Sequence, residues 1–312
     1  MGYPVKTANR IEPWIKGLSP ELRHSLWRLA VKTSRSFGRL TARIRVLPDY
    51  LILGTQRGGT TTLQKHLTQH PRIKSARFAK GVHFFDVNYQ RGEMWYRSHF
   101  HTGSGRAIVG RPYPILTGEA SPYYLYHPLA AERIAAVLER PRLIVVLRDP
   151  IERAFSHHQH EVARGFEDLS FEEALEAEPD RLAGEVERLM EDPGYVSHSH
   201  QHHSYLDRGM YHRQLAVYFE HFPRDQVFIA DSADLFQRPA EVYSRLLDFL
   251  GVEQHRLSEF EHLNPAPRTS KIEPATRRFL EAYFEEPNRK LSEMLGAAPS
   301  WVTLSSPSDS EH

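Results

Sequence analysis

Short apolar runs alternate with amphipathic segments along most of the chain. Residues 50–53, 115–117, 143–147 and 227–230 have the length and apolar character of β-strands. The unbroken run at 143–147 is typical of a strand covered on both faces of a parallel sheet. Helical spacing follows or separates these runs, at residues 63–70, 128–138, 150 onward, 170–192, 210–222, 239–250 and 274–295. This alternation predicts an α/β fold, a doubly wound parallel sheet with helices on both faces.

The remaining segments carry weaker patterns. Residues 72–114 mix aromatics, His and Gly, and we expect irregular elements there that cross the mouth of the sheet. Residues 193–204 and 255–273 are expected to be irregular, and residues 303–312 to be disordered. Ser170 with Glu173 three residues later predicts a capping box at the start of a helix.

The first 48 residues are basic, with ten Lys or Arg against Glu12 and Glu21. Apolar residues near helical spacing predict an amphipathic helix lying on the domain with a solvated basic face. The alternative is a peripheral contact of that face with anionic lipid or an acidic acceptor.

Composition narrows the classes of protein. The net charge of +1 gives no global field for nucleic acid, so no nucleic-acid partner is expected. The absence of Cys excludes disulfides and thiolate metal sites and fits a reducing compartment. No apolar run approaches the length of a membrane span, and the N-terminus lacks the apolar core of a signal peptide. These features predict a cytoplasmic protein.

The chemistry of the chain is organised around residues 54–62, Gly-Thr-Gln-Arg-Gly-Gly-Thr-Thr-Thr. They follow a strand and begin a helix that ends before Pro71. Glycines let backbone N–H groups close on an anion, and the helix start adds unpaired N–H groups and the positive end of its dipole. The segment is therefore a candidate phosphate cradle.

The cradle differs from a nucleoside-triphosphate P-loop at one informative position. Gly54 and Gly59 have the P-loop spacing, but Thr60 stands where Lys is expected, and the basic residue is Arg57. The strand at 143–147 ends in Arg148 rather than in a metal-binding Asp. A kinase needs Mg²⁺, whereas a sulfonyl group can be transferred by basic side chains and backbone donors alone. A P-loop kinase stays as a less favoured alternative.

A second candidate anion site follows the buried strand. Arg148 leaves the carboxyl edge of the sheet, where ligands of such sheets bind, and Ser156 lies along the next helix. A guanidinium and a hydroxyl that converge can hold a second phosphate. Two separate anion sites point to an adenosine bisphosphate rather than to ATP.

Six motifs, taken in order, resemble the PAPS-dependent sulfotransferases (PAPS is 3′-phosphoadenosine 5′-phosphosulfate). The chain is similar in particular to the heparan-sulfate-type sulfotransferase domain and its bacterial relatives, over about residues 48–296. The matching segments are 51–62 with 69–71, 82–86, 118–124, 147–156, 205–211 and 248–251. The resemblance implies a P-loop-like sheet. Together with the composition of the two ends, it predicts a sulfotransferase domain at residues 49–298, between a basic N-terminal helical extension at 1–48 and a polar tail at 299–312.

The resemblance also implies roles for individual residues. Arg57, Gly58, Gly59, Thr60, Thr61 and Thr62 would hold the 5′-phosphosulfate, and Arg57 would stabilise charge on the leaving phosphate. Arg148 and Ser156 would hold the 3′-phosphate, and Arg268 or Lys271 would belong to a basic loop that closes on the nucleotide. The product would be PAP (3′-phosphoadenosine 5′-phosphate), with no metal required. The acceptor would be a hydroxyl, or less readily an amine, of a carbohydrate, glycolipid or small molecule.

Two departures concern the general base. Many relatives have Glu where this chain has Gly81, and Lys where it has Ala120. The candidates for the base are Glu119, His83, Asp86 and His160, with Glu119 and His83 favoured because a carboxylate or an imidazole can accept a hydroxyl proton. The alternative is a nucleotide-binding relative with little or no activity.

The remaining histidine cluster is expected to be structural. His198, His200, His202 and His203 resemble a metal cluster, but no Cys or acidic ligand stands at fixed spacing from them. We therefore expect a loop there and no metal.

Overall fold

A computed structural model describes residues 38–77, 80–103, 115–261 and 271–302. Its centre is one sheet of parallel strands in the order β2-β3-β1-β4-β5. The strands are β1 (Tyr50–Gly54), β2 (Ile73–Ser75), β3 (Leu116–Ala120), β4 (Arg142–Leu147) and β5 (Val227–Asp231). The order reverses beside β1, so the carboxyl ends of β1 and β4 flank the crevice where ligands of such sheets bind.

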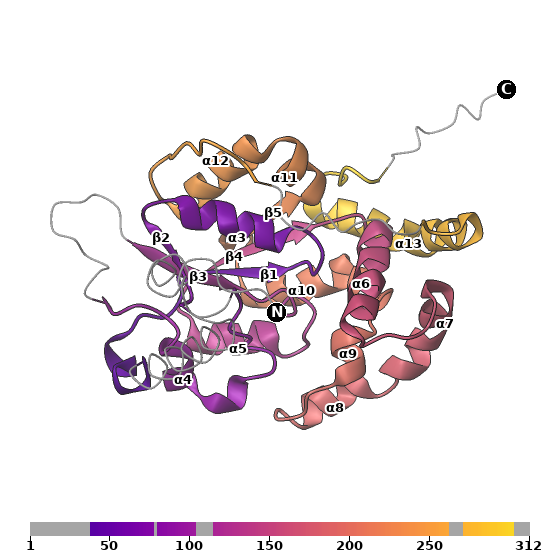
Figure 1. The fold of residues 1–312 in the computed structure, drawn as a ribbon, viewed down its shortest axis with the longest axis horizontal. Coiled ribbons are helices and arrows are strands. Elements are labelled where there is room, and N and C mark those ends of the chain that lie inside the picture. The colour runs from indigo at the N-terminus through magenta and orange to yellow at the C-terminus, as the bar shows by residue number, and fades with distance from the viewer. Residues whose placement is uncertain (1–37, 78–79, 104–114, 262–270, 303–312) are drawn as a thin grey trace, which may run out of the picture.

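Helices cover both faces of the sheet and extend one end of it (Figure 1). They are α3 (Thr60–Gln69), α4 (Glu93–Arg97), α5 (Ala130–Val137), α6 (Pro150–Arg164), α7 (Phe171–Leu182), α8 (Glu185–Glu191), α9 (His198–His202), α10 (Tyr211–His221), α11 (Ser232–Gln237), α12 (Pro239–Leu250) and α13 (Pro274–Leu295). Short 3₁₀ turns lie at Ala42–Ile44, Tyr89–Arg91, Asp207–Gly209 and Arg224–Gln226.

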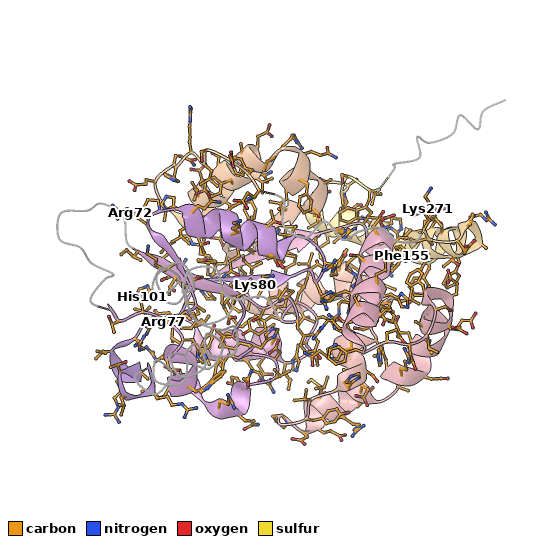
Figure 2. The ribbon with its side chains drawn as sticks, in the orientation of Figure 1. Arg72, Arg77, Lys80, His101, Phe155 and Lys271 are labelled. Atoms are coloured by element: carbon orange, nitrogen blue, oxygen red, sulfur yellow. The ribbon has the colours of Figure 1, made fainter. Side chains whose placement is uncertain are left out.

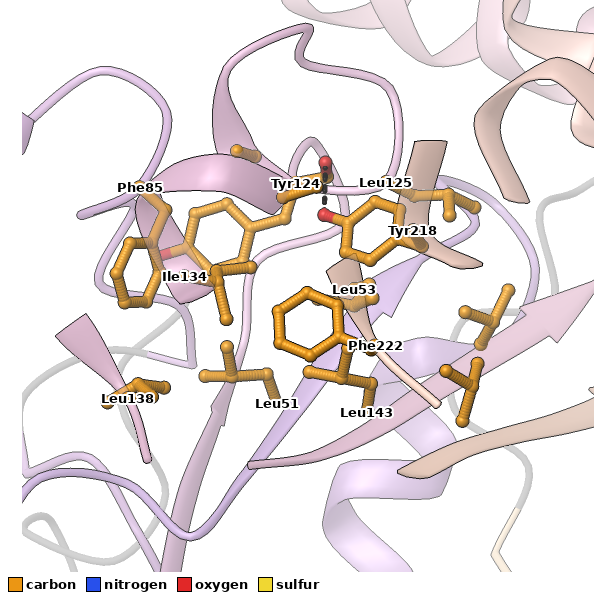
Figure 3. Close-up of a cluster of buried hydrophobic side chains, with 14 of the residues drawn as sticks. Leu51, Leu53, Phe85, Tyr124, Leu125, Ile134, Leu138, Leu143, Tyr218 and Phe222 are labelled. Atoms are coloured by element: carbon orange, nitrogen blue, oxygen red, sulfur yellow. Dashed lines mark hydrogen bonds between the residues drawn. The ribbon is translucent and has the colours of Figure 1, made fainter. Parts of the chain in front are cut away.

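Alternate residues of each strand enter different cores. Leu51 and Leu143 pack with Ile134 of α5 and Tyr218 of α10, and Figure 3 shows this cluster with the hydrogen bond from the Tyr218 hydroxyl to the Tyr124 carbonyl. The neighbouring positions of the same strands face the other side, where α3 and α12 pack (Figure 1). Because the side-chain period of a strand is two, a strand buried on both faces reads as the continuous apolar run seen at 143–147.

A third cluster joins the helices beyond the sheet. Ile151 and Phe155 of α6 pack against Phe171 of α7 and against Leu280 and Phe284 of α13. The cluster fixes α6 relative to the sheet edge from which it starts. Pro150 stands in the first turn of α6, and the Asp149 carboxylate caps the helix by accepting from the Ile151 amide.

The structure confirms the α/β class, the parallel sheet and the helices on both of its faces. The capping box of Ser170 and Glu173 is also confirmed. Strand β3 extends to Ala120, beyond the predicted run at 115–117, and residues 170–192 form two helices that separate at Gly184, whose φ is 73°. Strand β2, helix α9 and helix α11 were not predicted.

Some expectations lie outside the described residues. The predicted N-terminal helix falls mainly on residues 1–37, and the polar tail on residues 303–312. Of the helices that the structure describes, none combines the length and the apolar character needed to cross a membrane.

Candidate functional site

A cleft of about 910 Å³ opens at the carboxyl edge of the sheet. Its walls come from segments far apart in sequence: the loop after β1 with the start of α3, residues 80–83, the end of β3, helix α6, helix α9, the region of α11 and residues 300–301. Of the residues predicted for the site, the cleft is lined by Arg57, Gly59, Thr60, Thr61, Thr62, His83, Arg148, Ser156 and His160.

Two glycines shape the loop for close approach. A Cβ on Gly58 would lie 2.7 Å from the Val146 carbonyl oxygen, so this residue packs against β4 and does not line the cleft. Gly59 precedes α3 with a φ of 102°, a conformation that favours glycine. The first amides of α3, on Thr60 to Thr62, therefore stand at a helix start without side-chain caps, which is a favourable place for an anion.

Arg57 lies beside the residues expected to hold the other phosphate. Its Nε donates to Ser156 Oγ at 3.0 Å, and Arg148 Nη1 donates to the Arg57 carbonyl at 2.8 Å. Ser156 reaches this point because it lies two turns into α6. The structure thus brings the two predicted anion sites into one continuous cationic wall.

Lys80 is a cleft residue that the sequence analysis missed. Its Nζ donates to Thr60 Oγ1 at 2.9 Å and to Thr61 Oγ1 at 2.7 Å, and Figure 2 labels it near the centre of the molecule. Burial, reinforced by the nearby charge of Arg57, lowers the pKa of Lys80 to about 7. One indication of this role was present in the sequence. No lysine stands at position 60, and Lys80 lies next to Gly81, where many relatives have Glu.

His83 and Asp86 form a pair at the mouth of the cleft. His83 Nδ1 lies 2.7 Å from Asp86 Oδ2; the imidazole is 37% exposed and the carboxylate is fully buried. Burial opposes a charge on His83, but Asp86 outweighs it, so the pKa of His83 is raised. His83 has a φ of 54°, and its amide donates to Ser121 Oγ at 3.0 Å. This arrangement orients the ring and leaves the other ring nitrogen available for the cleft.

Glu119 faces away from the cleft. It has no solvent exposure, and its carboxylate accepts from Ser121 Oγ at 2.7 Å, from the hydroxyls of Tyr96 and Tyr124 at 2.8 Å, and from the Val82 amide. Burial raises the pKa of this carboxyl. Glu119 does not line the cleft, so the structure places it as a support for the 82–84 segment rather than beside a substrate.

Gly81 has no room for a larger residue. A Cβ there would lie 2.4 Å from the Ala120 carbonyl oxygen and 2.6 Å from Ser121 Oγ. The glutamate that the family resemblance leads one to expect at this position would therefore need a displaced end of β3.

The other predicted residues are spread more widely. His160 lines the cleft from α6, and burial, with Arg57 as the next cause, lowers its pKa. Lys271 lies by a separate hollow of about 470 Å³, together with Phe155 and His158, and Figure 2 labels Lys271 close to Phe155. Arg268 lies outside the described residues.

Of the histidines of α9, His200 and His202 are buried and His198 is exposed. The Tyr123 hydroxyl and His200 Nδ1 lie 2.8 Å apart, and His202 Nδ1 lies 2.9 Å from Glu161. Among the residues that the structure describes, no three His, Asp or Glu side chains gather in a way that could hold a metal ion.

Residues 300–301, expected in a polar tail, contribute to the cleft. The Ser300 amide donates to Asp231 Oδ2 at 2.9 Å, at the end of β5. Trp301 donates from Nε1 to Asn288 Oδ1 at 3.2 Å and packs edge-on against Tyr211. Both residues line the cleft wall that includes α11.

A parallel sheet with a glycine loop, a helix start and several cations at its carboxyl edge defines a P-loop-like protein with an anion-binding cleft. Residues 47–266, more than half of the chain, match the family model described as the sulfotransferase domain. The chain belongs to the sulfotransferase family.

Individual relatives agree with this assignment. The chain is 26% identical to the membrane-associated sulfotransferase kil1 of Dictyostelium discoideum, over 83% of this chain and 67% of that protein. It is 30% identical to the human heparan sulfate glucosamine 3-O-sulfotransferase 3B1, over 67% of this chain and 47% of the relative, so it spans about half the length of that enzyme. A sulfotransferase structure from Alicyclobacillus acidocaldarius superposes with a TM-score of 0.60 at 27% identity, over 82% of this chain and 98% of that one.

The expectation of a cytoplasmic protein is wrong as an inference from composition. A relative that matches 83% of the chain is named as membrane-associated. The missing Cys and the missing apolar span are features of composition, and neither determines the cellular location of a protein.

Proposed function

We propose that the chain transfers the sulfonyl group of PAPS to a hydroxyl of a carbohydrate. The observation that carries this proposal is the contact of the cations Arg57 and Arg148 with each other and with the Ser156 hydroxyl, beside the start of α3. Family membership supports the type of reaction, and the two anion sites support the type of nucleotide.

The charges of the cleft suit an anionic ligand. Within the described part of the chain, Arg57 and Lys80 direct their side-chain hydrogen bonds to hydroxyl groups, and neither forms an ion pair with a carboxylate. Half-buried cations without a paired carboxylate are costly, and an anion at the helix start would offset that cost. A nucleotide with phosphates at both its 3′ and 5′ positions fits this donor set.

The proposed roles follow from position. The amides of Thr60, Thr61 and Thr62 hold the 5′-phosphate end, while Arg148 and Ser156 hold the 3′-phosphate. Arg57 lies between them and neutralises charge at both. PAPS supplies the sulfonyl group and leaves as PAP. No metal is required, because fixed cations and amides provide the electrostatic stabilisation.

We assign the general base to His83. Its ring faces the cleft, and Asp86 fixes Nδ1, so Nε2 can accept the proton of an acceptor hydroxyl. Asp86 then acts as a positioning residue, because it is buried and does not line the cleft. His160 lines the wall next to Ser156 and lies on the nucleotide side of the cleft.

The acceptor class comes from the relatives. Their names record action on heparan sulfate, in one group as 3-O-sulfotransferases and in another as N-deacetylase/N-sulfotransferases. A carbohydrate acceptor is therefore proposed, and the comparisons give no support to a glycolipid, a small metabolite or a membrane contact of the N-terminal segment.

Thermal stability in the presence of nucleotides tests the site. PAP should raise the melting temperature far more than AMP, because only PAP engages both anion sites. Arg148→Ala should remove that preference, and Arg57→Ala should weaken the binding of both nucleotides. Arg213→Ala is the control, since that side chain is 69% exposed and lies outside the cleft. Equal shifts by PAP and AMP in the unaltered protein would contradict the proposal.

Sulfate transfer to a panel of carbohydrates tests the reaction itself. We expect transfer from PAPS in the presence of a chelator. Binding of PAP with no transfer to any acceptor would favour the alternative of an inactive nucleotide-binding relative. Phosphoryl transfer from ATP that depends on Mg²⁺ would instead favour a kinase.

A further inference from the structure

We propose that Lys80 is a second cation at the 5′-phosphate, beside Arg57, and takes the part of the lysine missing from position 60. The inference rests on the proposed function and adds to it a residue outside the glycine loop. It also explains how a loop with Thr60 in the usual lysine position can still hold a strongly charged group.

The geometry places the Lys80 ammonium on the start of α3. Nζ lies 2.9 Å from Thr60 Oγ1 and 2.7 Å from Thr61 Oγ1, and these threonines are the first two residues of the helix. The amides of the same residues belong to the proposed anion cradle. An anion bound there would therefore accept hydrogen bonds from the helix amides and pair with the Lys80 ammonium beside them.

The surroundings of Lys80 are mostly cationic or neutral. Arg57 approaches from the loop after β1 and disfavours the charged ammonium, and α3 contributes only hydroxyls. The other titratable side chains near it are His83, which is paired with Asp86, and the buried Glu119. The four hydrogen bonds that the Glu119 carboxylate accepts come from other residues than Lys80. No described carboxylate is thus paired with Lys80, and a bound phosphate would be its counter-ion.

Charge compensation by Lys80 predicts proton uptake on binding. In the free protein the pKa of this ammonium is lowered to about 7, so above neutral pH much of it is unprotonated. A phosphate dianion beside Nζ favours the charged form and raises that pKa. Binding of a 5′-phosphate above pH 7 must then draw up to about one proton from the buffer.

The same position suits the transfer step. A bond forms between the acceptor oxygen and sulfur while the bond from sulfur to the 5′-phosphate oxygen breaks, and the acceptor proton passes to His83. The electron pair of the broken bond stays on the phosphate oxygen, where the Lys80 ammonium compensates the new charge without giving up its proton.

Isothermal titration calorimetry with PAP and with adenosine 3′-phosphate separates this role from others. Lys80→Met should lower the affinity for PAP by about 10- to 100-fold, because a charge-assisted hydrogen bond is lost. It should leave the affinity for adenosine 3′-phosphate unchanged, because that nucleotide lacks the 5′-phosphate. Lys74→Met, on the exposed side of β2, is the matched control and should change neither affinity.

A second variant tests the proton. At pH 8, titrations in buffers of different ionisation enthalpy should show proton uptake for the unaltered protein with PAP. Lys80→Arg should keep most of the PAP affinity and lose the uptake, because a guanidinium stays protonated.

The outcomes separate the two proposals. If the unaltered protein prefers PAP to AMP but Lys80→Met binds PAP normally, the inference about Lys80 is overturned and the nucleotide site stands. If Lys80→Met loses affinity for PAP and for adenosine 3′-phosphate equally, the residue is structural and the inference again fails. If the unaltered protein shows no preference for PAP, the proposed function itself fails.

Discussion

At the scale of single residues, His83 is held more tightly than a cleft histidine needs to be for packing alone. Its positive φ, its amide bond to Ser121 and its pairing with Asp86 all fix the direction of one ring. Strained backbone of this kind is kept where the surrounding structure gains from it, and a fixed proton acceptor is one such gain.

Substitution of the pair should reveal its catalytic part. His83→Gln should lower kcat by about 10²- to 10⁴-fold, the usual contribution of a general base, with a small change in PAP affinity. His221→Gln, at an exposed end of α10, is the control. A His83→Gln protein with unchanged kcat would rule out the base assignment.

The pH dependence of the rate gives an independent test. Since the pKa of His83 is raised in the folded protein, the neutral imidazole dominates only above that raised value. The rate should therefore increase with pH through a midpoint above the ordinary histidine value. Asp86→Asn should move this midpoint to lower pH and reduce the plateau, because the ring loses both its charge partner and its orientation. A midpoint that stays in place would count against the pair.

Sequence reasoning found residues whose place follows from local structure. Arg57, Thr60 to Thr62, Arg148 and Ser156 come directly after strands or in the first turns of helices, so topology alone brings them to the cleft. Lys80 and Glu119 could not be assigned in this way. Lys80 reaches the cleft through a contact with α3, and the direction of Glu119 depends on the alternation of a strand that was expected to have ended.

At the scale of elements, the end of β3 is fixed by Glu119. Its carboxylate accepts hydrogen bonds from hydroxyls of α4 and of residues 121 and 124. It also accepts one from the Val82 amide, in the segment that carries His83. These bonds connect the edge of the sheet to the proposed base.

A conservative change should separate support from catalysis. Glu119→Gln replaces an acceptor oxygen with a donor, so at least one buried hydroxyl or amide loses its partner. We expect a loss of about 1–3 kcal/mol in the free energy of unfolding, measured by denaturant titration, with kcat of the folded protein reduced only modestly. Glu139→Gln, at an exposed position, is the control. A collapse of kcat without loss of stability would restore Glu119 as a base.

Long, strongly patterned elements were predictable and short ones were not. The run at 143–147 and the helix at Pro274–Leu295 have enough residues for their period to be read. Strand β2 has three residues and α11 has six, too few for a period to emerge. Strand β2 forms because β3 supplies its hydrogen-bond partners, and α11 packs Leu235 into the core on one face of the sheet.

At the scale of the whole molecule, the cleft is completed by residues distant from the family match. Ser300 and Trp301 follow α13, beyond the matched residues 47–266, and they line the cleft through contacts with Asp231 and Asn288. The predicted domain end at residue 298 would remove them.

Two truncations test that boundary. A chain ending at Ala298 should bind PAP more weakly and melt at a lower temperature than the full chain, because the contacts of Ser300 and Trp301 are lost. A chain ending at Val302 keeps those contacts and should match the full chain in both measurements. If the two truncations behave alike, the domain ends at residue 298 as predicted.

The strand order has a consequence for the timing of assembly. Strand β1 pairs with β3 and β4, whose partners for Tyr50 are Gly118 and Arg142, so the sheet closes only after long loops have been brought together. Such non-local pairing makes folding slow, and a cleft whose walls come from six or more separated segments is complete only at the end. A nucleotide has little to bind in the folding transition state, so it should lengthen the lifetime of the native protein rather than hasten its formation.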